Sequence, residues 1–246
     1  MSYKEFSYYY DYFNYNADYD VLADKIHIWA SSEKLDGKIA CDLGCGTGEF
    51  AIRLHEKGWD VIAVDCSEEM LDVFNDKRAE LGLYDILILN QDITQLDMYG
   101  TVDLFTCTFD TVNHLNGAAD VQKLFDKVSL FMHSDGVFIF DMNSEYKHIN
   151  VLGDEKFCFE EEEADCIWQN TLDKEKGRTK ISITINDKQS DETYSEEFFE
   201  HFYSLEQIES MLGKAGMKIC KVIDGESFEE VTETSQRYLF MVKKEQ

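Results

Sequence analysis

The segment Ile39-Ala-Cys-Asp-Leu-Gly-Cys-Gly-Thr-Gly-Glu-Phe50 constrains the fold of this chain more than any other stretch. It opens with an apolar run typical of a buried strand, and Gly44, Gly46 and Gly48 follow where a helix would begin near Glu49. Glycine permits positive φ and leaves no Cβ between the backbone and a ligand, so a small molecule can lie on such a turn. The helix N-terminus beyond it favours a negatively charged ligand group. Many strand-to-helix turns also carry glycines for tight packing alone, so the loop does not decide the function by itself.

The length and composition of the chain indicate a globular protein. Its 246 residues can bury a full core as one large α/β domain, and a hydrophobic content of 44% excludes disorder. No stretch approaches the roughly 18 uninterrupted apolar residues of a membrane-spanning helix, and the aromatic, acidic N-terminus does not resemble a signal peptide. The seven cysteines are odd in number and form no Cys-x-x-Cys pair, which indicates reduced thiols. We therefore expect a cytoplasmic protein without a bound metal.

Acidic residues outnumber basic ones along the whole chain, with 50 Asp and Glu against 23 Lys and Arg and a net charge of −27. Neither half offers the basic surface that binds phosphates, so nucleic acids and anionic membranes are disfavoured as partners. The simplest interpretation of the acidity is solubility. We expect a small molecule as the partner, and a monomer or a weak homodimer.

The N-terminus is rich in tyrosine and phenylalanine. The spacing of Phe6, Tyr9, Tyr10 and Phe13 places these rings on one face of a helix. That face could pack on the core, or it could close over a cofactor, because tyrosine combines a broad apolar ring with a hydroxyl group. A second helix is expected over residues 21–31.

From Ile39 the pattern alternates between strands and helices with short connections. Strands are expected over residues 38–43, 60–64, 86–89, 102–108 and 136–140, and helices over residues 49–57, 67–81 and 118–132. The strand runs are apolar throughout, as is typical of parallel strands covered on both faces. We therefore predict a doubly wound α/β sheet that binds its ligand at the carboxyl ends of the strands.

Residues 145–203 break this order with longer stretches of alternating and β-branched residues. Antiparallel strands are expected over residues 156–169, 178–186 and 196–203. Ser204 and Gln207 are then spaced as a capping box for a helix. That helix is expected over residues 204–216, and two last strands over residues 218–223 and 237–242. We predict one α/β domain (residues 1–144 and 204–246) that carries residues 145–203 as an inserted antiparallel β subdomain.

An acidic residue falls at the carboxyl end of four successive strands, at Asp42, Asp65, Asp92 and Asp110. A carboxylate at the end of the second strand, here Asp65, can accept hydrogen bonds from both hydroxyls of a ribose. A nicotinamide site usually shows Gly-x-Gly-x-x-Gly, whereas here the third glycine comes one residue early and Asp42 would repel a pyrophosphate. The pattern favours a ligand with an amino-acid moiety, whose ammonium group Asp42 could bind.

The motifs Asp42-Leu-Gly-Cys-Gly-Thr-Gly48, Val64-Asp65-Cys-Ser-Glu-Glu-Met-Leu71 and Asn90-Gln-Asp-Ile93 resemble, in order and spacing, those of class I S-adenosylmethionine-dependent methyltransferases. Phe109-Asp-Thr-Val-Asn-His-Leu115, Gly136-Val-Phe-Ile-Phe-Asp-Met-Asn143 and the β insertion resemble the small-molecule branch, which includes glycine and sugar-amine N-methyltransferases. The resemblance covers residues 36–143 strongly and residues 190–243 loosely. It departs at His133-Ser-Asp-Gly136, where the family usually has a proline before the glycine. It implies a Rossmann-like, seven-stranded fold with S-adenosyl-L-methionine as cofactor.

The resemblance also implies roles for individual residues. The glycines would contact the methionine portion, Asp42 would hold its ammonium group, and Asp65 would bind the ribose hydroxyls. Asp92 would accept from the adenine amino group, the backbone N–H of Ile93 would meet a ring nitrogen, and Phe109 would lie near the sulfonium. The expected cofactor-binding residues are Tyr10, Asp42, Gly44, Cys45, Gly46, Gly48, Asp65, Cys66, Gln91, Asp92, Ile93 and Phe109.

Methyl transfer from a sulfonium needs alignment, a desolvated pocket and, for some acceptors, a base. The candidate bases are Asp110, His114 and His201, and His114 is preferred because it follows the fourth strand, beside the expected methyl position. We expect a methyltransferase that acts on a small molecule, with an amine nitrogen as acceptor and the insertion as the roof of the acceptor pocket. The alternatives are a tRNA or protein methyltransferase, a binding protein without catalysis, and a nicotinamide oxidoreductase.

Overall fold

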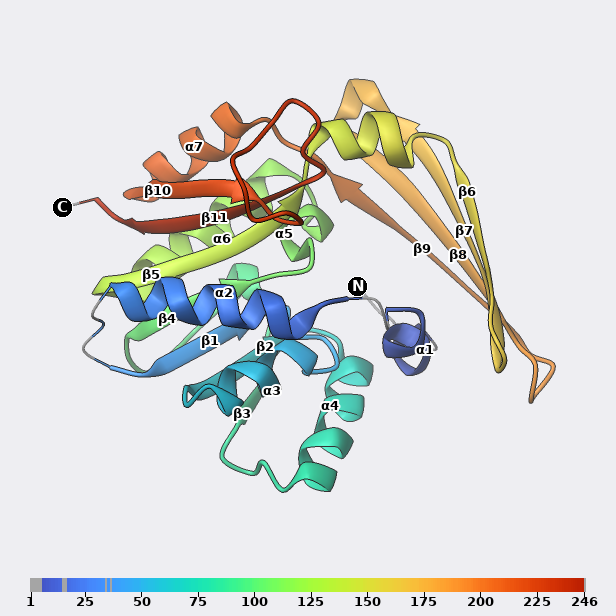
Figure 1. Ribbon diagram of the computed structural model, residues 1–246, viewed down its shortest axis with the longest axis horizontal. Coiled ribbons are helices and arrows are strands. Elements are labelled where there is room, and N and C mark those ends of the chain that lie inside the picture. The colour runs from blue at the N-terminus through green and yellow to red at the C-terminus, as the bar shows by residue number, and fades with distance from the viewer. Residues whose placement is uncertain (1–5, 15–16, 34, 36, 246) are drawn as a thin grey trace.

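The computed structural model describes residues 6–14, 17–33, 35 and 37–245 of the chain. Its main element is a seven-stranded sheet in the order β10-β11-β5-β4-β1-β2-β3, in which β1 to β5 are parallel and β11 runs antiparallel to β5 and β10 (Figure 1). Its strands are β1 (Ile39–Leu43), β2 (Asp60–Asp65), β3 (Leu87–Asn90), β4 (Val102–Cys107), β5 (Met132–Asn143), β10 (Met217–Asp224) and β11 (Arg237–Lys244). The predicted doubly wound fold is confirmed, and β5 extends at both ends beyond the predicted residues 136–140.

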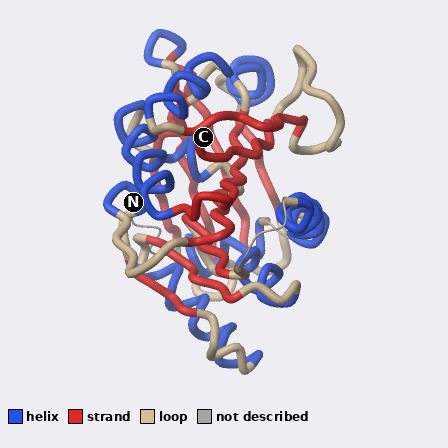
Figure 2. Tube along the Cα trace, turned by 90° about the vertical axis from the view of Figure 1, so that its left-hand side faces the viewer, coloured by secondary structure: helices blue, strands red, loops and turns tan. Residues whose placement is uncertain are grey.

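Helices cover both faces of this sheet, as Figures 1 and 2 show from two directions. One face is covered by α2 (Tyr19–Ser32), α3 (Glu49–Glu56) and α4 (Glu68–Leu81), which share a core cluster with the sheet. The other face is covered by α6 (Ala118–Phe131) and α7 (Leu205–Lys214). The capping box predicted for Ser204 and Gln207 is present at the start of α7. No helix in the described part of the chain is long and apolar enough to cross a membrane.

A second sheet of four antiparallel strands projects from the main sheet, in the order β6-β7-β8-β9 (Figure 1). Its strands are β6 (Lys156–Glu160), β7 (Ala164–Asp173), β8 (Arg178–Asp187) and β9 (Thr193–His201). The prediction of one strand over residues 156–169 is wrong, because the chain reverses at residues 161–163 and forms a hairpin there. One face of this sheet carries its own small apolar core.

The helix α1 (Phe6–Phe13) bridges the two sheets. Tyr9 packs against the apolar face of the second sheet, and its hydroxyl group donates a hydrogen bond to Asp187 at 2.7 Å. On the other side, Asp11 accepts a hydrogen bond at 2.6 Å from the hydroxyl of Thr47 in the glycine turn. The side chain of Phe6, which was predicted on the aromatic face, lies outside the described residues.

Candidate active site

The glycine turn between β1 and α3 places its three glycines in different surroundings. All have positive φ, at 71°, 52° and 84° for Gly44, Gly46 and Gly48. A Cβ on Gly48 would lie 2.2 Å from the ring of Phe74, and a Cβ on Gly44 would lie 2.4 Å from Thr111, so tight packing excludes a side chain at both positions. A Cβ on Gly46 would meet no atom within 4 Å. Of the three, Gly46 is therefore the position where a ligand can lie directly on the backbone.

Asp65 ends β2 beside this turn, and backbone groups hold its side chain. The carboxylate accepts hydrogen bonds from the backbone N–H groups of Gly46 and Ser67, both at 2.9 Å. Burial raises the pKa of Asp65, and these N–H groups oppose the rise. Since each carboxylate oxygen has two lone pairs, each can still accept a hydrogen bond from a sugar hydroxyl.

Asp42, near the end of β1, is a buried carboxylate. It is 2% exposed, and the hydroxyl of Thr106 in β4 donates a hydrogen bond to it at 2.7 Å. Burial raises the pKa of Asp42 to about 7; the Thr106 hydrogen bond opposes this rise, and the charge of Asp65 adds to it. Among the basic side chains that the structure describes, none lowers this pKa by its charge. A positively charged ligand group would stabilise the carboxylate here.

Asp42, Gly44 and Gly46 line a cleft that aromatic side chains from the two N-terminal helices close. The lining residues are Tyr10, Tyr19, Asp42, Gly44, Cys45, Gly46, Thr47, Glu49, Phe50, Thr108, Phe109 and Thr111. Tyr10 belongs to α1, while Tyr19 begins α2 and its ring lies 4.5 Å from that of Phe109, centroid to centroid. The sequence analysis missed Tyr19, because no motif spacing connects it to the glycine turn.

Six predicted cofactor residues lie outside this lining: Gly48 at the start of α3, and Asp65, Cys66, Gln91, Asp92 and Ile93 near the ends of β2 and β3. Asp92 is exposed and accepts hydrogen bonds from the backbone N–H and the hydroxyl of Thr94, both at 2.8 Å, so it caps the short helix η1 (Ile93–Gln95). Ile93 is buried, Gln91 is half-buried and Cys66 is exposed. Contact between these residues and the cofactor stays a prediction.

After β4 the chain makes a strained turn at Phe109 and Asp110. Both residues have φ of 56°, a left-handed conformation that costs a non-glycine residue roughly 1–3 kcal/mol. The carboxylate of Asp141 in β5 holds this turn by accepting hydrogen bonds from the N–H groups of Phe109 at 3.0 Å and Asp110 at 2.7 Å. Arg237 of β11 pairs with both acids, at 2.6 Å from Asp110 and 3.0 Å from Asp141. We call these four residues the Arg237 clamp.

The clamp was not predicted from the sequence. Asp141 and Arg237 lie in largely apolar strands far apart in the chain, and a charged residue in such a strand was the available signal. Burial would raise the pKa of Asp110, but Arg237 and His114 hold it well below its usual range. The two carboxylates in turn raise the pKa of Arg237, although burial opposes this. The guanidinium therefore stays charged inside the protein.

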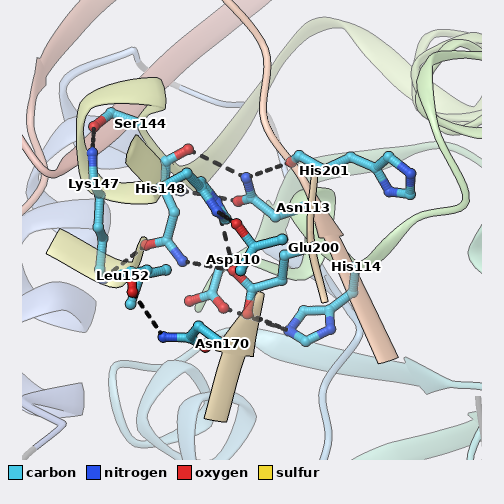
Figure 3. A network of polar contacts seen from close by, with 12 residues as sticks. Asp110, Asn113, His114, Ser144, Lys147, His148, Leu152, Asn170, Glu200 and His201 are labelled. Atoms are coloured by element: carbon cyan, nitrogen blue, oxygen red, sulfur yellow. Dashed lines mark hydrogen bonds and ion pairs between the residues drawn. The ribbon is translucent and has the colours of Figure 1, made fainter. Parts of the chain in front are cut away.

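The short helix α5 (Thr111–His114) turns His114 back toward Asp110. Its Nε2 lies 3.4 Å from Oδ2 of Asp110 and 3.8 Å from Oε1 of Glu200, which β9 of the second sheet supplies (Figure 3). Burial alone would lower the pKa of His114, but Asp110 and Glu200 raise it above its usual value. We call Asp110, His114 and Glu200 the His114 cluster. The structure thus brings two predicted candidates together and adds Glu200, which the sequence analysis missed.

Glu200 is 3% exposed, and polar groups surround its second carboxylate oxygen, Oε2. Oε2 accepts a hydrogen bond from Asn143 at 3.3 Å and lies 3.6 Å from Nε2 of His148, in the π-helical turn η2 (Lys147–Leu152) (Figure 3). Burial raises the pKa of Glu200 and lowers that of His148 to about 4, so His148 is neutral at physiological pH.

The ligand atoms of the His114 cluster lie within 4.8 Å of one another, so they could hold a metal ion, but Arg237 already binds Asp110.

His201, the third predicted base, follows Glu200 directly but lies outside the cluster. Successive side chains along a strand point to opposite faces, and the ring of His201 points away from the cluster (Figure 3). Its backbone carbonyl accepts a hydrogen bond from Asn113 at 2.8 Å. The structure therefore separates His201 from Asp110 and His114.

Comparison with known proteins supports one family. Residues 40–136 match the model of a methyltransferase domain. The crystal structure of an S-adenosylmethionine-dependent methyltransferase from Clostridium acetobutylicum ATCC 824 is 30% identical, with a TM-score of 0.89, and the similarity covers 97% of this chain and 96% of that chain. A relative from Geobacillus sp. (strain WCH70), provisionally named a methyltransferase, is 29% identical over 99% of this chain and 100% of its own length. A sugar N-methyltransferase from Streptoalloteichus sp. ATCC 53650 shares the fold, with a TM-score of 0.74 and 16% identity over 96% of this chain and 93% of that chain.

The cleft agrees with this similarity. The open backbone at Gly46, the spare acceptor positions of Asp65 and the buried charge of Asp42 fit a ligand that combines an amino acid with a nucleoside. The chain belongs to the class I S-adenosylmethionine-dependent methyltransferases, and S-adenosyl-L-methionine is its cofactor.

Proposed function

We propose that this enzyme methylates the amine nitrogen of a small molecule and that His114 accepts the proton that the amine loses. The His114 cluster carries this proposal, because two carboxylates flank the imidazole at 3.4 and 3.8 Å. Phe109, next to Asp110 in the chain, lines the cofactor cleft, so the cluster lies beside that cleft. The carboxylates would attract a protonated amine and then stabilise the imidazolium. A neutral hydroxyl acceptor would bring no charge for them to bind.

For the cofactor, we propose that Asp65 binds the ribose hydroxyls and that Asp42 binds the ammonium group. The backbone at Gly46 supports the methionine portion, while Tyr10 and Phe109 close the cleft around it. The remaining proposed contacts come from Gly44, Cys45, Gly48, Cys66, Gln91, Asp92 and Ile93. The free acceptor positions of Asp65 and the raised pKa of Asp42 support these roles.

When bound, S-adenosylmethionine supplies a methyl group that the nitrogen lone pair takes while the carbon–sulfur bond breaks and leaves its electron pair on sulfur. The imidazole of His114 receives the amine proton, and Asp110 and Glu200, which face its Nε2, stabilise the new positive charge. The Arg237 clamp keeps Asp110 in place. The helix α1 and the second sheet shield the site in part, since the side chains of His114 and Asp110 are 21% and 18% exposed.

We further propose that residues 145–203 form an acceptor subdomain on a cofactor domain made of residues 1–144 and 204–246. Glu200 reaches the His114 cluster from this insertion. The insertion also carries the apolar face on which α1 packs. Both contacts support a role in binding the acceptor.

The test measures release of S-adenosylhomocysteine with a panel of small amines and with alcohols of the same carbon skeleton. We expect turnover of amines. His114→Gln should lower kcat by about 10²-fold or more, since a general base contributes that much, and cofactor affinity should not change. The matched control is His55→Gln, which breaks only a surface contact with Asp85 at 2.8 Å and should leave kcat unchanged. Preferential turnover of the alcohols, or a His114→Gln variant as fast as the parent, would contradict the proposal.

A further inference from the structure

We propose that the acceptor is an amine attached to an apolar body and that it carries no carboxylate or phosphate. This inference rests on the amine methylation proposed above. It follows from the charges around the His114 cluster and from the wall that β7, β8 and β9 build beside it.

Carboxylates dominate the charge around His114. Asp110, Asp141 and Glu200 are all at least half-buried there. Arg237 is already shared between the first two, at 2.6 and 3.0 Å. An acidic group on the acceptor would meet three carboxylates in a site where burial weakens solvent screening, so it would be repelled.

Lys147 is the second fixed cation of this region, and it is also engaged. Its Nζ donates a hydrogen bond to the side-chain oxygen of Asn143 at 2.9 Å. Burial lowers the pKa of Lys147, and the charge of Arg237 lowers it further, against the opposing pull of Asp110 and Glu200. Counted formally, Asp110, Asp141 and Glu200 against Arg237 and Lys147 give a charge of −1 before His114 itself is counted. The site therefore suits a cationic acceptor.

An apolar wall begins directly beside His114. The ring of Phe198 lies 5.1 Å from the imidazole, centroid to centroid, and the ring of Trp168 lies 6.3 Å from that of Phe198. Phe198 and Glu200 are two residues apart in β9, so they point to the same face of the sheet. The strand register places Ile181 opposite Phe198, and Ile181 is fully buried. We call Trp168, Ile181 and Phe198 the apolar wall.

The apolar wall continues toward the cofactor cleft. Tyr10 of α1 packs against the core cluster of the wall and also lines the cleft. One surface therefore runs from the cofactor through Tyr10 to Phe198, with His114 and its carboxylates at its edge. Ile181 and Phe198 are 0% and 7% exposed because α1 packs on this face, so an acceptor would replace apolar side-chain contacts here. An apolar body would restore such contacts, whereas a polyhydroxylated body would leave hydroxyl groups without partners.

The first experiment compares matched acceptors at a fixed concentration of S-adenosylmethionine. Phenethylamine and phenylalanine differ by one carboxylate, while phenethylamine and ethanolamine differ in the apolar body. We expect kcat/KM for phenethylamine to exceed that of each partner by at least about tenfold, equivalent to 1.4 kcal/mol. A rate for phenylalanine, ethanolamine or glucosamine equal to or above that of phenethylamine would overturn the inference.

The second experiment tests the wall itself. Phe198→Ala should raise the KM for phenethylamine by about tenfold or more while leaving kcat and cofactor affinity within about twofold. The matched control is Phe199→Ala, because Phe199 points to the other face, where its ring stacks on the Arg178 guanidinium at 4.1 Å. Melting temperatures show whether each variant is folded. Equal KM changes in the two folded variants would show that the apolar wall does not bind the acceptor.

The outcomes separate this inference from the proposal on which it rests. If the enzyme prefers acidic or hydroxylated amines to phenethylamine, the proposal of amine methylation is retained. Only the inference of an apolar acceptor without a carboxylate is then overturned. Turnover of phenethyl alcohol but of no amine overturns both. Absence of turnover with every amine of the panel likewise overturns both.

Discussion

The proposed cofactor side and the proposed acceptor side of the active site are built in different ways. On the cofactor side, Asp42 and Asp65 lie near the carboxyl ends of β1 and β2, and Gly46 lies in the turn between them, all within one short stretch of sequence. Backbone N–H groups of nearby residues hold Asp65, and the hydroxyl of Thr106 holds Asp42. On the acceptor side, Asp110 meets Arg237, which is 127 residues away in the chain, and His114 meets Glu200 from the second sheet. The first half depends on local turns, whereas the second depends on how β5, β9 and β11 come together. Damage to distant elements should therefore disable methyl transfer before it disables cofactor binding.

The largest expected effect comes from removing the second sheet. Replacement of residues 156–202 by a short Gly/Ser linker should abolish methyl transfer, because Glu200 and the apolar wall are lost. Cofactor affinity should stay within about tenfold, or 1.4 kcal/mol, because the glycine turn and the strand ends remain. Calorimetry and a methyl-transfer assay on the folded variant measure the two effects. Comparable methylation of the native acceptor would show that the two halves are not divided as proposed.

Arg237→Leu should be the most destabilising point substitution on the acceptor side. It leaves Asp110 and Asp141 buried without a cation, which costs about 3–5 kcal/mol of the free energy of unfolding. Lys243→Gln on the same strand is the matched control, since it breaks only the half-exposed pair with Glu33 and should cost under about 1 kcal/mol. Chemical denaturation measures both. Equal losses in the two variants would show that the clamp does not stabilise the turn.

Asp65→Ala should damage the cofactor side alone. It removes the charged acceptor that we propose for two ribose hydroxyls, so S-adenosylmethionine should bind about 2–4 kcal/mol more weakly. Asp60→Ala, at the exposed opposite end of β2, should leave the affinity unchanged. Isothermal titration calorimetry decides between these outcomes. Unchanged affinity in the Asp65 variant would show that Asp65 does not bind the ribose hydroxyls.

Asp42→Asn should stabilise the cofactor-free protein while weakening cofactor binding. Because the pKa of Asp42 is raised to about 7, the folded state binds its proton more tightly than the unfolded state, and this stability is lost as pH rises through 7. Asparagine carries no charge, so the variant should gain roughly 1–3 kcal/mol at pH 8. The gain should shrink as pH falls below 7. Denaturation at pH 6 and pH 8 measures this, and an equal gain at both would contradict the assignment.

The smallest expected effect is a change in the pH profile on the acceptor side. A base must be neutral to accept a proton, so log kcat/KM should rise with pH through the raised pKa of His114. Glu200→Gln removes a charge that raises this pKa, so the rising limb should move to lower pH. Glu197→Gln, on the same strand with Lys180 as its partner, is the control and should leave the limb in place. A rising limb at the same pH in both variants would show that Glu200 does not raise the pKa of His114.

Regular local patterns predicted most of the fold. Continuous apolar runs indicated the parallel strands, and the capping residues Ser204 and Gln207 marked the start of α7. The prediction of one strand over residues 156–169 failed because the turn at residues 161–163 contains acidic residues and no glycine, proline, asparagine or aspartate. The helix α5 is a single turn, too short to show a helical period.

For the candidate active site, the sequence by itself determined the glycine turn and the acids at the strand ends, because each such residue lies in, or within a few residues of, the strand that positions it. It also placed Asp110 and His114 four residues apart, a spacing that one helical turn brings together. Only the tertiary structure decided that Arg237 and Asp141 hold the strained turn, that Glu200 joins His114, and that His201 does not. These contacts depend on strand register and on the docking of distant strands, since a shift of one residue in β9 would exchange Glu200 with His201. Local spacing carries no information on that register, whereas the packing of the second sheet determines it.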